Sequence, residues 1–401
     1  MLGVIFGRQD PVGGILRDYG AVLVVAFLVG LAATPVCRRL ALRFGVVDYP
    51  DNGVKTHTEP TAYLGGMGIW AGMLAGVVLG ICMLKYWPHE SAESLGPMKA
   101  GFTGRYPDWL ILAGIALGAT MACALGVLDD IVDLMPGYKL LGQAAAAVVL
   151  VAVGIRPNLE AVYTFLHVEP SAFWDIIITL PIVLFFILGA TNSLNLLDGL
   201  DGLCAGVTAI ITVAFALLAL TLATWRYSPV GDPVRLILCL ALAGGTLGFL
   251  PMNRHPARIF MGDGGSMLLG FVAGALMLLF AETMGRWTVA AVIIFGLPIL
   301  DTAVALVRRL LNKKPLFVSD RGHIYDQFMD RGMSLRQSVK LCYVLAGLYA
   351  VVGLVVSQIR FRYAAVFFFV LVIISGYVMA HGGFLRMSES KKDCECSDNL
   401  G

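Results

Sequence analysis

Charged residues are scarce in this chain. Asp, Glu, Lys and Arg make up only 14% of its 401 residues, whereas soluble globular domains carry roughly 25%. The formal net charge is +2, so the chain lacks the excess of Lys and Arg that attracts nucleic acids or other acidic partners. The composition argues against a soluble globular domain, and we expect no nucleic-acid partner.

Several common signatures are also missing. The glycine-rich stretch FMGDGGS (260–266) is not followed by Gly-Lys-Ser or Gly-Lys-Thr, which excludes a Walker-type phosphate-binding loop. Six of the eight Cys residues lie in or beside apolar runs, where Cys usually acts as a small apolar side chain. Cys394 and Cys396 have no His cluster near them, which disfavours a metal site there. No internal repeat is visible, so the pattern does not support an inverted-repeat transporter.

Apolar residues dominate what is present. They form 58% of the chain, in eleven runs that approach the roughly 20 residues a helix needs to cross a bilayer. These runs are continuous rather than alternating, which predicts helices and excludes barrel strands. The runs lie near residues 18–36, 62–84, 109–128, 140–155, 173–190, 203–224, 234–250, 266–281, 287–307, 339–357 and 363–380. The fourth and eighth runs are short, so their boundaries are open.

We therefore predict an all-α polytopic integral membrane protein with about eleven transmembrane helices. One multi-span domain is expected over residues 1–387. The polar segment 388–401 is expected to be a disordered cytoplasmic tail.

Basic residues are spread unevenly over the connections between these runs. Alternate connections on one side hold 18 Lys and Arg, and those on the other side hold 11, which together are all 29. The connection from Arg308 to Lys340 alone holds eight. Because cytoplasmic connections are enriched in Lys and Arg, we predict an N-terminus outside and a cytoplasmic C-terminus in the inner (plasma) membrane. Arg38 and Arg39 directly follow the first run, which indicates a retained span rather than a cleaved signal peptide.

Polar clusters gather on the predicted cytoplasmic face. The connections after the third, fifth, seventh and ninth runs lie there, and each contains Asp together with Gly. The outward connections hold acidic residues without a repeated pattern of Asp, Asn and Gly. The four stretches are GVLDDIVDL (126–134), NSLNLLDGLDGL (192–203), NRHPARIFMGDGGS (253–266) and KKPLFVSDRGHIYD (313–326). One face of the membrane is therefore predicted to carry the active site.

The first two stretches place carboxylates at the ends of helices. Asp129 and Asp130 close the third run, where adjacent negative charges oppose the helix dipole; a solvated helix end is the alternative. Asp198 and Asp201 are three residues apart, so a helical turn would bring both to one face, with Asn195 a turn earlier. Capping and tight packing around the neighbouring glycines are the alternative there.

The other two stretches have features of an anion site. Asp263 is predicted to lie in a glycine-rich turn before the eighth run, where N–H groups can point at an anion while the carboxylate holds a bridging cation. A generic glycine turn capped by Ser266 is the alternative. In the last loop, Arg321 and His323 stand beside Asp320. A guanidinium suits bidentate phosphate binding, and an imidazole can exchange a proton near neutral pH.

The ligand types in these clusters favour a hard metal ion. Carboxylates and amides without a Cys and His set indicate Mg²⁺, with Mn²⁺ as the alternative, rather than zinc. Such an ion completes its shell with substrate phosphates, so the pattern indicates phosphoryl transfer at the membrane surface. A nucleotide sugar can reach this face from the cytoplasm, and a lipid acceptor can enter between helices. A transporter, the alternative class of function, would need ionisable residues inside the spans, and Asp301 is the one clear candidate.

The order and spacing of these motifs resemble one enzyme family. GVLDDIVDLMPGYKLLGQ, NSLNLLDGLDGL, GFLPMNRHPARIFMGDGGS and the Asp-Arg-x-His loop resemble the polyprenyl-phosphate N-acetylhexosamine-1-phosphate transferases, of the glycosyltransferase family 4 type. VDYPDNGVKTHTEPTAYLGG (47–66) is similar to the first cytoplasmic loop of that family. The resemblance extends over residues 20–380.

The resemblance implies an activity, a metal and its ligands. The family moves an amino-sugar 1-phosphate from a UDP-N-acetylhexosamine to a polyprenyl phosphate such as undecaprenyl phosphate, releasing UMP. The lipid-linked diphosphate sugar then initiates cell-envelope glycan synthesis. Mg²⁺ dependence is implied, with Asp129, Asp130 and Asp263 as metal ligands. The implied catalytic residues are Asp129, Asp130, Asp263, Arg321 and His323.

The resemblance also implies which residues bind the substrates. Phe260 is expected to stack on the uracil. The implied substrate-binding residues are Lys55, His57, Lys139, Asn192, Asn195, Asp198, Asp201, Asn253 and Phe260. Direct in-line attack and a covalent Asp intermediate both stay open as mechanisms. Membrane lipids are expected partners, and the sequence is compatible with a homodimer.

Two branches of the family compete. SDRGHIYD (319–326) resembles the Asp-Arg-x-His-x-His-His form of the N-acetylglucosamine 1-phosphate branch, whereas the phospho-N-acetylmuramoyl-pentapeptide branch has a triple His. Tyr325 and Asp326 stand where the second and third His are expected, and Val54 stands where Arg usually precedes Lys55. The loop favours UDP-N-acetylglucosamine as the donor. Muramoyl-pentapeptide transfer and transfer from another UDP-N-acetylhexosamine are the alternatives.

Overall fold

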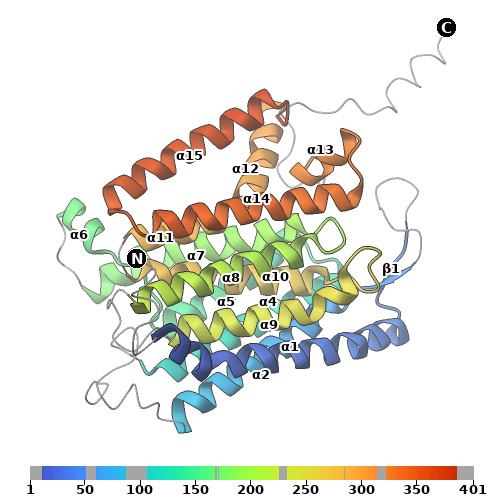
Figure 1. Ribbon diagram of the computed structural model, residues 1–401, viewed down its shortest axis with the longest axis horizontal. Coiled ribbons are helices and arrows are strands. Elements are labelled where there is room, and N and C mark those ends of the chain that lie inside the picture. The colour runs from blue at the N-terminus through green and yellow to red at the C-terminus, as the bar shows by residue number, and fades with distance from the viewer. Residues whose placement is uncertain are drawn as a thin grey trace.

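The computed structural model describes residues 11–50, 60–86, 106–167, 169, 171–224, 233–283, 285–313 and 322–385. Most of these residues are helical, and most of the helices run roughly parallel or antiparallel to one another (Figure 1). The helices are α1 (Pro11–Phe44), α2 (Gly65–Tyr86), α4 (Asp108–Val132), α5 (Pro136–Ala152), α6 (Glu160–Leu166), α7 (Ala172–Leu197), α8 (Leu203–Thr224), α9 (Pro233–Asn253), α10 (Gly262–Ala281), α11 (Gly285–Ile294), α12 (Gly296–Leu311), α13 (Ile324–Asp330), α14 (Leu335–Val356) and α15 (Phe361–His381). The tail predicted at 388–401 lies outside the described residues.

Nine of the described helices are long and apolar enough to cross a membrane. They are α1, α2, α4, α7, α8, α9, α10, α14 and α15. α5 is apolar but has only 17 residues, and α11 and α12 reach the required length only as a pair bent by 69°. Each of the eleven predicted runs therefore lies on a helix or on this bent pair. The prediction of an all-α polytopic membrane protein is confirmed.

The ninth predicted run, at 287–307, is not one continuous helix. α11 ends at Ile294, and α12 begins at Gly296. Pro298 explains the break, because in a continuous helix its ring would clash with the carbonyl of Ile294, four residues earlier, and it has no N–H to bond that carbonyl. Figure 1 shows α12 crossing the direction of the long helices.

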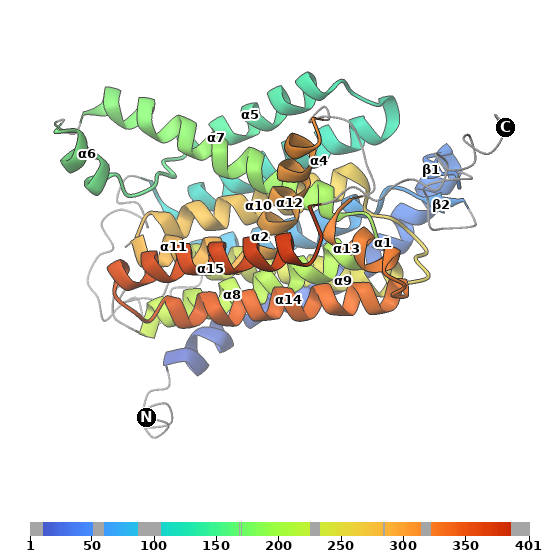
Figure 2. The ribbon, with the colours of Figure 1, turned by 90° about the horizontal axis from the view of Figure 1, so that it is seen from above.

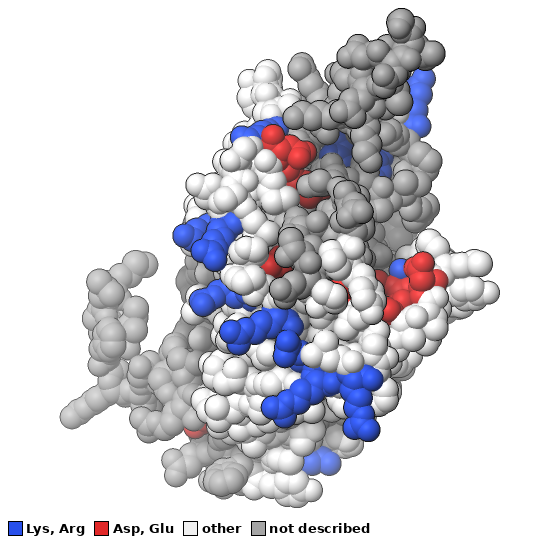
Figure 3. All heavy atoms as spheres, turned by 90° about the vertical axis from the view of Figure 1, so that its right-hand side faces the viewer, with Lys and Arg blue, Asp and Glu red and all other residues white. Residues whose placement is uncertain are grey.

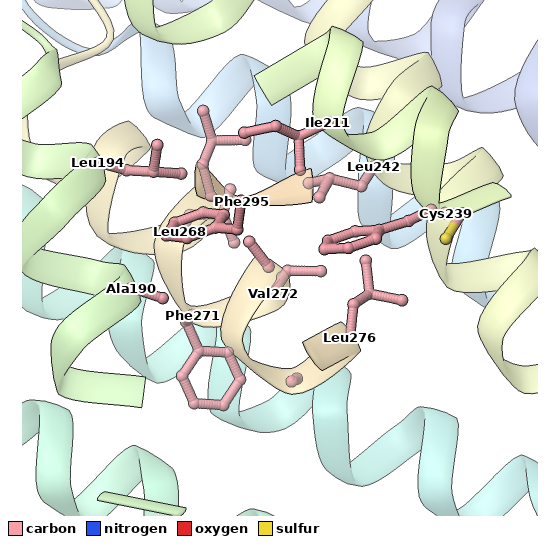
Figure 4. Packing of buried hydrophobic residues seen from close by; sticks show 14 of the residues in the cluster. Ala190, Leu194, Ile211, Cys239, Leu242, Leu268, Phe271, Val272, Leu276 and Phe295 are labelled. Carbon is pink, nitrogen blue, oxygen red and sulfur yellow. The ribbon is translucent and has the colours of Figure 1, made fainter. Parts of the chain in front are cut away.

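α10 is the central helix of the bundle. It packs against α2, α4, α7 and α11, and its apolar length is buried by protein throughout. Figure 2 shows α10 between a layer that contains α5 and α7 and a layer that contains α8, α9 and α14. In Figure 4, Leu268, Val272 and Leu276 of α10 lie among apolar side chains of α7, α8 and α9. A helix enclosed on all sides is apolar all round, as this one is after its first turn.

Glycines bring the helix backbones together at one end of the bundle. A Cβ atom on Gly126 of α4 would lie closer than 3.0 Å to backbone atoms of Asp263 and Gly264, and one on Gly66 of α2 would meet Gly264 and Gly265 as closely. Only residues without a side chain allow such an approach. The beginning of α10 is therefore wedged between α2 and α4.

A small patch of extended chain holds the segment before α10. β1 (Val47–Asp48) pairs antiparallel with β2 (Thr61–Ala62). Ala62 also bridges to Ile259 in parallel, and the N–H of Phe260 donates to the carbonyl of Ala62 (2.8 Å). These bonds fix residues 259–261 against the chain that leads into α2.

Candidate active site

Asp130 lies in the last turn of α4 and caps the beginning of α10. Its Oδ1 accepts the backbone N–H of Asp263 (2.8 Å), and its Oδ2 accepts that of Gly264 (3.2 Å). The first N–H groups of a helix have no partner inside the helix, and a carboxylate there also interacts favourably with the helix dipole. Asp130 is therefore a cap of the neighbouring helix rather than a solvated helix end.

Asp263 lies in the first turn of α10 and not in a turn before it, so the predicted boundary of the eighth run is wrong. The helix begins at Gly262 because Asp130 supplies the cap from another helix, which a local pattern could not reveal. Asn195, near the end of α7, donates through Nδ2 to Asp263 Oδ1 (2.8 Å) and to Ser266 Oγ (2.9 Å). Asp263 is thus held between α4, α7 and its own helix.

Lys139 of α5 joins two of the carboxylates. It forms an ion pair with Asp129 Oδ2, and its Nζ lies 3.6 Å from Asp263 Oδ2. Asp129 Oδ1 also accepts the N–H of Leu134 (2.8 Å). The side chain of Asp129 is 3% exposed and that of Lys139 is 27% exposed, so the pair is partly shielded from water. The structure brings Asp129, Asp130, Asp263, Lys139 and Asn195 together, as their assignment to one site requires.

Asp198 and Asp201 do not share a helical face, and that prediction is wrong. α7 ends at Leu197, and Asp198 is the residue that follows its last turn. The chain then turns through Gly202, whose φ of 77° favours glycine. Burial, and then the carboxylates of Asp263 and Asp130, raise the pKa of Asp198 well above its usual range. The negative charges of Asp263 and Asp130 therefore act on the carboxyl group of Asp198.

Asp201 and Asn253 hold loops in place. Asp201 Oδ2 accepts the N–H of Ala257 (3.1 Å) and lies 2.8 Å from Nδ1 of His255. Asn253 is buried; its Oδ1 accepts the N–H of Gly202 (3.1 Å), and its Nδ2 donates to the carbonyl of Ile259 (3.0 Å). Both groups of the Asn253 amide are used inside the protein, where they shape the segment before α10.

Asn192 and Phe260 flank the cluster. Asn192 donates through Nδ2 to Gln143 Oε1 (2.9 Å) and to the carbonyl of Leu188 (2.7 Å), which ties α7 to α5. Phe260 makes an edge contact with Tyr63, their ring centroids 6.0 Å apart, and is half-buried. Phe260 is therefore placed beside the first turn of α10, as a residue that stacks on a base at this site would be.

The C-terminal part of the chain packs against the end of α7. His323 directly precedes α13, and its Nδ1 lies 2.8 Å from Oδ2 of Asp301 on α12. The ring of Tyr325 stacks on that of His323, and the Tyr325 hydroxyl donates to the carbonyl of Leu196 (3.1 Å). Tyr325 and Asp326, which replace expected His residues, are both buried. Tyr325 thus packs against the end of α7 and the turn that follows it, and His323 stacks on Tyr325.

Three predicted site residues cannot be placed. Lys55, His57 and Arg321 lie outside the described residues. Three contacts around the site were not predicted. They join Gln143 to Asn192, His255 to Asp201, and Thr302 to Ser193 (2.9 Å). A signal for Gln143 was present, because it lies four residues after Lys139 and so on the same face of α5.

The charges of this end of the molecule suit a phosphate substrate with a cation. Asp129 and Asp263 lie beside the ammonium of Lys139, and Asp130 caps the helix that carries Asp263, so among the described residues three carboxylates stand against one ammonium here. Among the described residues no group of three His, Cys, Asp or Glu forms a ready-made metal site. The predicted set of three metal ligands, Asp129, Asp130 and Asp263, is therefore not present as such a group, because both oxygens of Asp130 bond backbone N–H groups. Mg²⁺ can be held by one or two carboxylates when substrate phosphates supply its other ligands. Figure 3 shows this end of the molecule, where Lys and Arg atoms (blue) form a row and Asp and Glu atoms (red) appear in separate patches.

Comparison with known proteins gives a consistent result. The family model described as "Glycosyl transferase family 4" matches residues 112–281. The chain is 33% identical over 357 residues to a probable undecaprenyl-phosphate N-acetylglucosaminyl 1-phosphate transferase of Bacillus subtilis, a match that covers 88% of this chain and 89% of that protein. It is 30% identical over 361 residues to a decaprenyl-phosphate N-acetylglucosaminephosphotransferase of Mycolicibacterium smegmatis (86% and 84%). It is also 30% identical over 371 residues to a phospho-N-acetylmuramoyl-pentapeptide-transferase of Desulforamulus reducens (85% and 97%).

These matches confirm the resemblance found in the motifs and the branch to which the last loop points. They extend over nearly the whole chain, and the family model includes the stretches that carry Asp129, Asp130, Asn195 and Asp263. The chain belongs to glycosyl transferase family 4, as a polytopic membrane member of its polyprenyl-phosphate sugar-1-phosphate transferases.

Proposed function

We propose that the protein transfers N-acetylglucosamine 1-phosphate from UDP-N-acetylglucosamine to a polyprenyl phosphate and releases UMP. Undecaprenyl phosphate is the acceptor that we propose. The product would initiate the synthesis of a cell-envelope glycan. The observation that carries the proposal is the cluster in which Lys139 bridges Asp129 and Asp263 while Asp130 caps α10. The printed names of the Bacillus and Mycolicibacterium relatives support the donor sugar.

The proposed reaction exchanges one phosphoanhydride for another. An oxygen of the polyprenyl phosphate forms a bond to the phosphorus that carries the sugar, and the bond from that phosphorus to the oxygen of UMP breaks. Lys139 and Asn195 hold the carboxylates of Asp129 and Asp263 in fixed positions. Because each of the three carboxylates is already engaged by two groups, we infer a direct transfer in which they act by position and charge, without a covalent Asp intermediate.

Mg²⁺ is the cofactor that this set of oxygen ligands fits, with Asp263 and Asp129 as its ligands and Asp130 supporting them through the first turn of α10. When bound, the ion neutralises the diphosphate and the departing UMP. We place the site on the cytoplasmic face of the plasma membrane, with the N-terminus outside and the C-terminus inside. The uneven distribution of Lys and Arg over the connections supports that orientation.

Transfer of phospho-N-acetylmuramoyl-pentapeptide is the second candidate, because the Desulforamulus relative carries that name. The Asp-Arg-x-His pattern of residues 320–323 and the printed names of the Bacillus and Mycolicibacterium relatives support the N-acetylglucosamine branch instead. A transporter has less support, since the carboxylate of Asp301 is engaged by His323 and by the N–H of Ile324 (2.7 Å).

The test is a panel of radiolabelled UDP-sugars incubated with the purified full chain, polyprenyl phosphate and Mg²⁺, with label entering the lipid phase as the measurement. We expect transfer from UDP-N-acetylglucosamine and its loss in Asp263→Asn and Asp130→Asn. Asp133→Asn is the matched control, because it makes the same charge change at an exposed residue of the same stretch and Asn tolerates the positive φ of 51° there. Near-wild-type transfer by both Asp263→Asn and Asp130→Asn would refute the mechanism, and preferred transfer from another donor would refute the assigned sugar.

A further inference from the structure

Asp301 is a fully buried carboxylate that the proposed transfer does not use. It lies on α12, is 0% exposed, and has both oxygens occupied. Its Oδ2 lies 2.8 Å from Nδ1 of His323, and its Oδ1 accepts the N–H of Ile324 (2.7 Å). A buried carboxylate needs such partners, because an unpaired one is costly. Asp301 therefore fixes the side chain of His323 and the backbone that follows it.

This contact also determines the chemistry of the imidazole. A carboxylate only accepts hydrogen bonds, so the Nδ1 atom that faces it carries a proton. The basic nitrogen of the neutral ring is then Nε2. The contact thus selects one of the two tautomers and holds the ring in one orientation.

Two further contacts attach this unit to the candidate site. Thr302, next to Asp301, donates to Ser193 Oγ on α7 (2.9 Å). Tyr325 stacks on His323 at an interplanar angle of 9° and donates to the carbonyl of Leu196 (3.1 Å). A Cβ atom on Gly199 would collide with the ring of Tyr325, so the turn beside Asp198 lies directly against this ring. His323 is therefore held at a fixed place relative to the last turn of α7.

We propose that Asp301, on α12, is a positioning residue for the transfer reaction because it sets the tautomer and orientation of His323. This inference rests on the proposed transferase function. According to this inference, Asp301 affects the reaction only through His323. A carboxylate that only stabilised the fold would show no such dependence on His323.

A double-mutant cycle on the full chain in detergent tests the inference. The variants are Asp301→Asn, His323→Gln and the double variant, with kcat and KM for UDP-N-acetylglucosamine as the readout. Asn keeps an oxygen for the N–H of Ile324 but loses the charge. We expect each single variant to lower kcat by about tenfold or more, since a misplacement of about 1 Å at a reacting centre can cost about 100-fold. The double variant should be no slower than His323→Gln, within about twofold, because groups that act as a unit are not additive.

Val307→Ala is the matched control, because it shortens an exposed side chain on the same helix that makes none of these contacts. We expect its kcat to stay within about twofold of wild type, in the range of ordinary surface or peripheral changes. Losses that multiply in the double variant, or near-wild-type kcat in either single variant, would overturn the inference. Absence of transfer by the wild-type chain would instead refute the proposed function.

A measurement on the wild-type chain covers the case in which Asp301→Asn does not fold. Nitrogen NMR of the protein labelled with ¹⁵N-histidine reports which ring nitrogens carry protons, and the His323→Gln spectrum identifies the signals of His323. We expect a proton on Nδ1 of His323 across neutral pH. A ring protonated on Nε2 alone would overturn the inference.

Discussion

Gly126→Ala should move Asp129 and Asp130, at the end of α4, away from Asp263, at the beginning of α10. The new Cβ would lie closer than 3.0 Å to backbone atoms of Asp263 and Gly264, whereas ordinary contact begins at 3.4 Å. Because both neighbours are backbone and the shortest separation is 2.3 Å, α4 and α10 must move apart by about 1 Å, more than the roughly 0.5 Å within which a catalytic arrangement has to be held. The shift lengthens the hydrogen bonds from Asp263 and Gly264 to Asp130. We expect kcat to fall about 10- to 100-fold, since an error of about 1 Å costs about 100-fold.

The same substitution should lower the free energy of unfolding by about 1 to 3 kcal/mol, the usual cost of overpacking. The assay is label transfer from UDP-N-acetylglucosamine, with thermal unfolding in detergent measured in parallel. Gly189→Ala is the matched control, because this glycine is also inside a spanning helix and nothing lies within 4 Å of the added Cβ. Its kcat should match wild type. A Gly126→Ala variant with unchanged kcat would show that the contact between α4 and α10 does not set the geometry of the site.

Three other expectations can be checked with the same protein. Phe260→Ala should raise the KM for the UDP-sugar by the equivalent of about 0.5 to 1.5 kcal/mol of ring stacking with little change in kcat, and an unaltered KM would speak against stacking on uracil. Removal of divalent metal with EDTA should stop UMP release until Mg²⁺ is added back, and turnover that continues in EDTA would exclude the metal assignment. Arg156→Ala breaks a partly exposed ion pair with Asp175 (2.9 Å) at the other end of the bundle. It should cost up to about 1 kcal/mol of stability, and a large fall in its kcat would mean that this pair acts on the site.

The sequence predicted the helices and the residues that meet at the site better than it predicted their local geometry. Long apolar runs are a local signal, so each of the eleven runs lies on a helix or on the bent pair α11 and α12, although only nine of the described helices reach spanning length. The break in the ninth run could have been read from Pro298. Asp130 shows the limit. Its role as a cap depends on α10, 133 residues further along the chain, and no local pattern reports such a contact. The same holds for the true beginning of α10 at Gly262.

The turn after α7 shows a second limit. The spacing of Asp198 and Asp201 is that of one helical turn, but the helix ends at Leu197 and Asp201 turns toward His255 and Ala257. The tight packing given as the alternative is found at Gly199, which makes room for the ring of Tyr325, a residue 126 positions away. Partners so distant in sequence decide which of two locally reasonable conformations forms.

The enclosure of α10 has a consequence for biogenesis. The ribosome delivers α2, α4, α7, α8 and α9 before α10, and these helices supply most of the surfaces that surround it. Since chains assemble from the N-terminus during synthesis, a slot for α10 can exist in the bilayer before that helix emerges. Five glycines, poor residues for a helix alone in lipid, can then be accommodated because the helix goes directly into a protein-lined space.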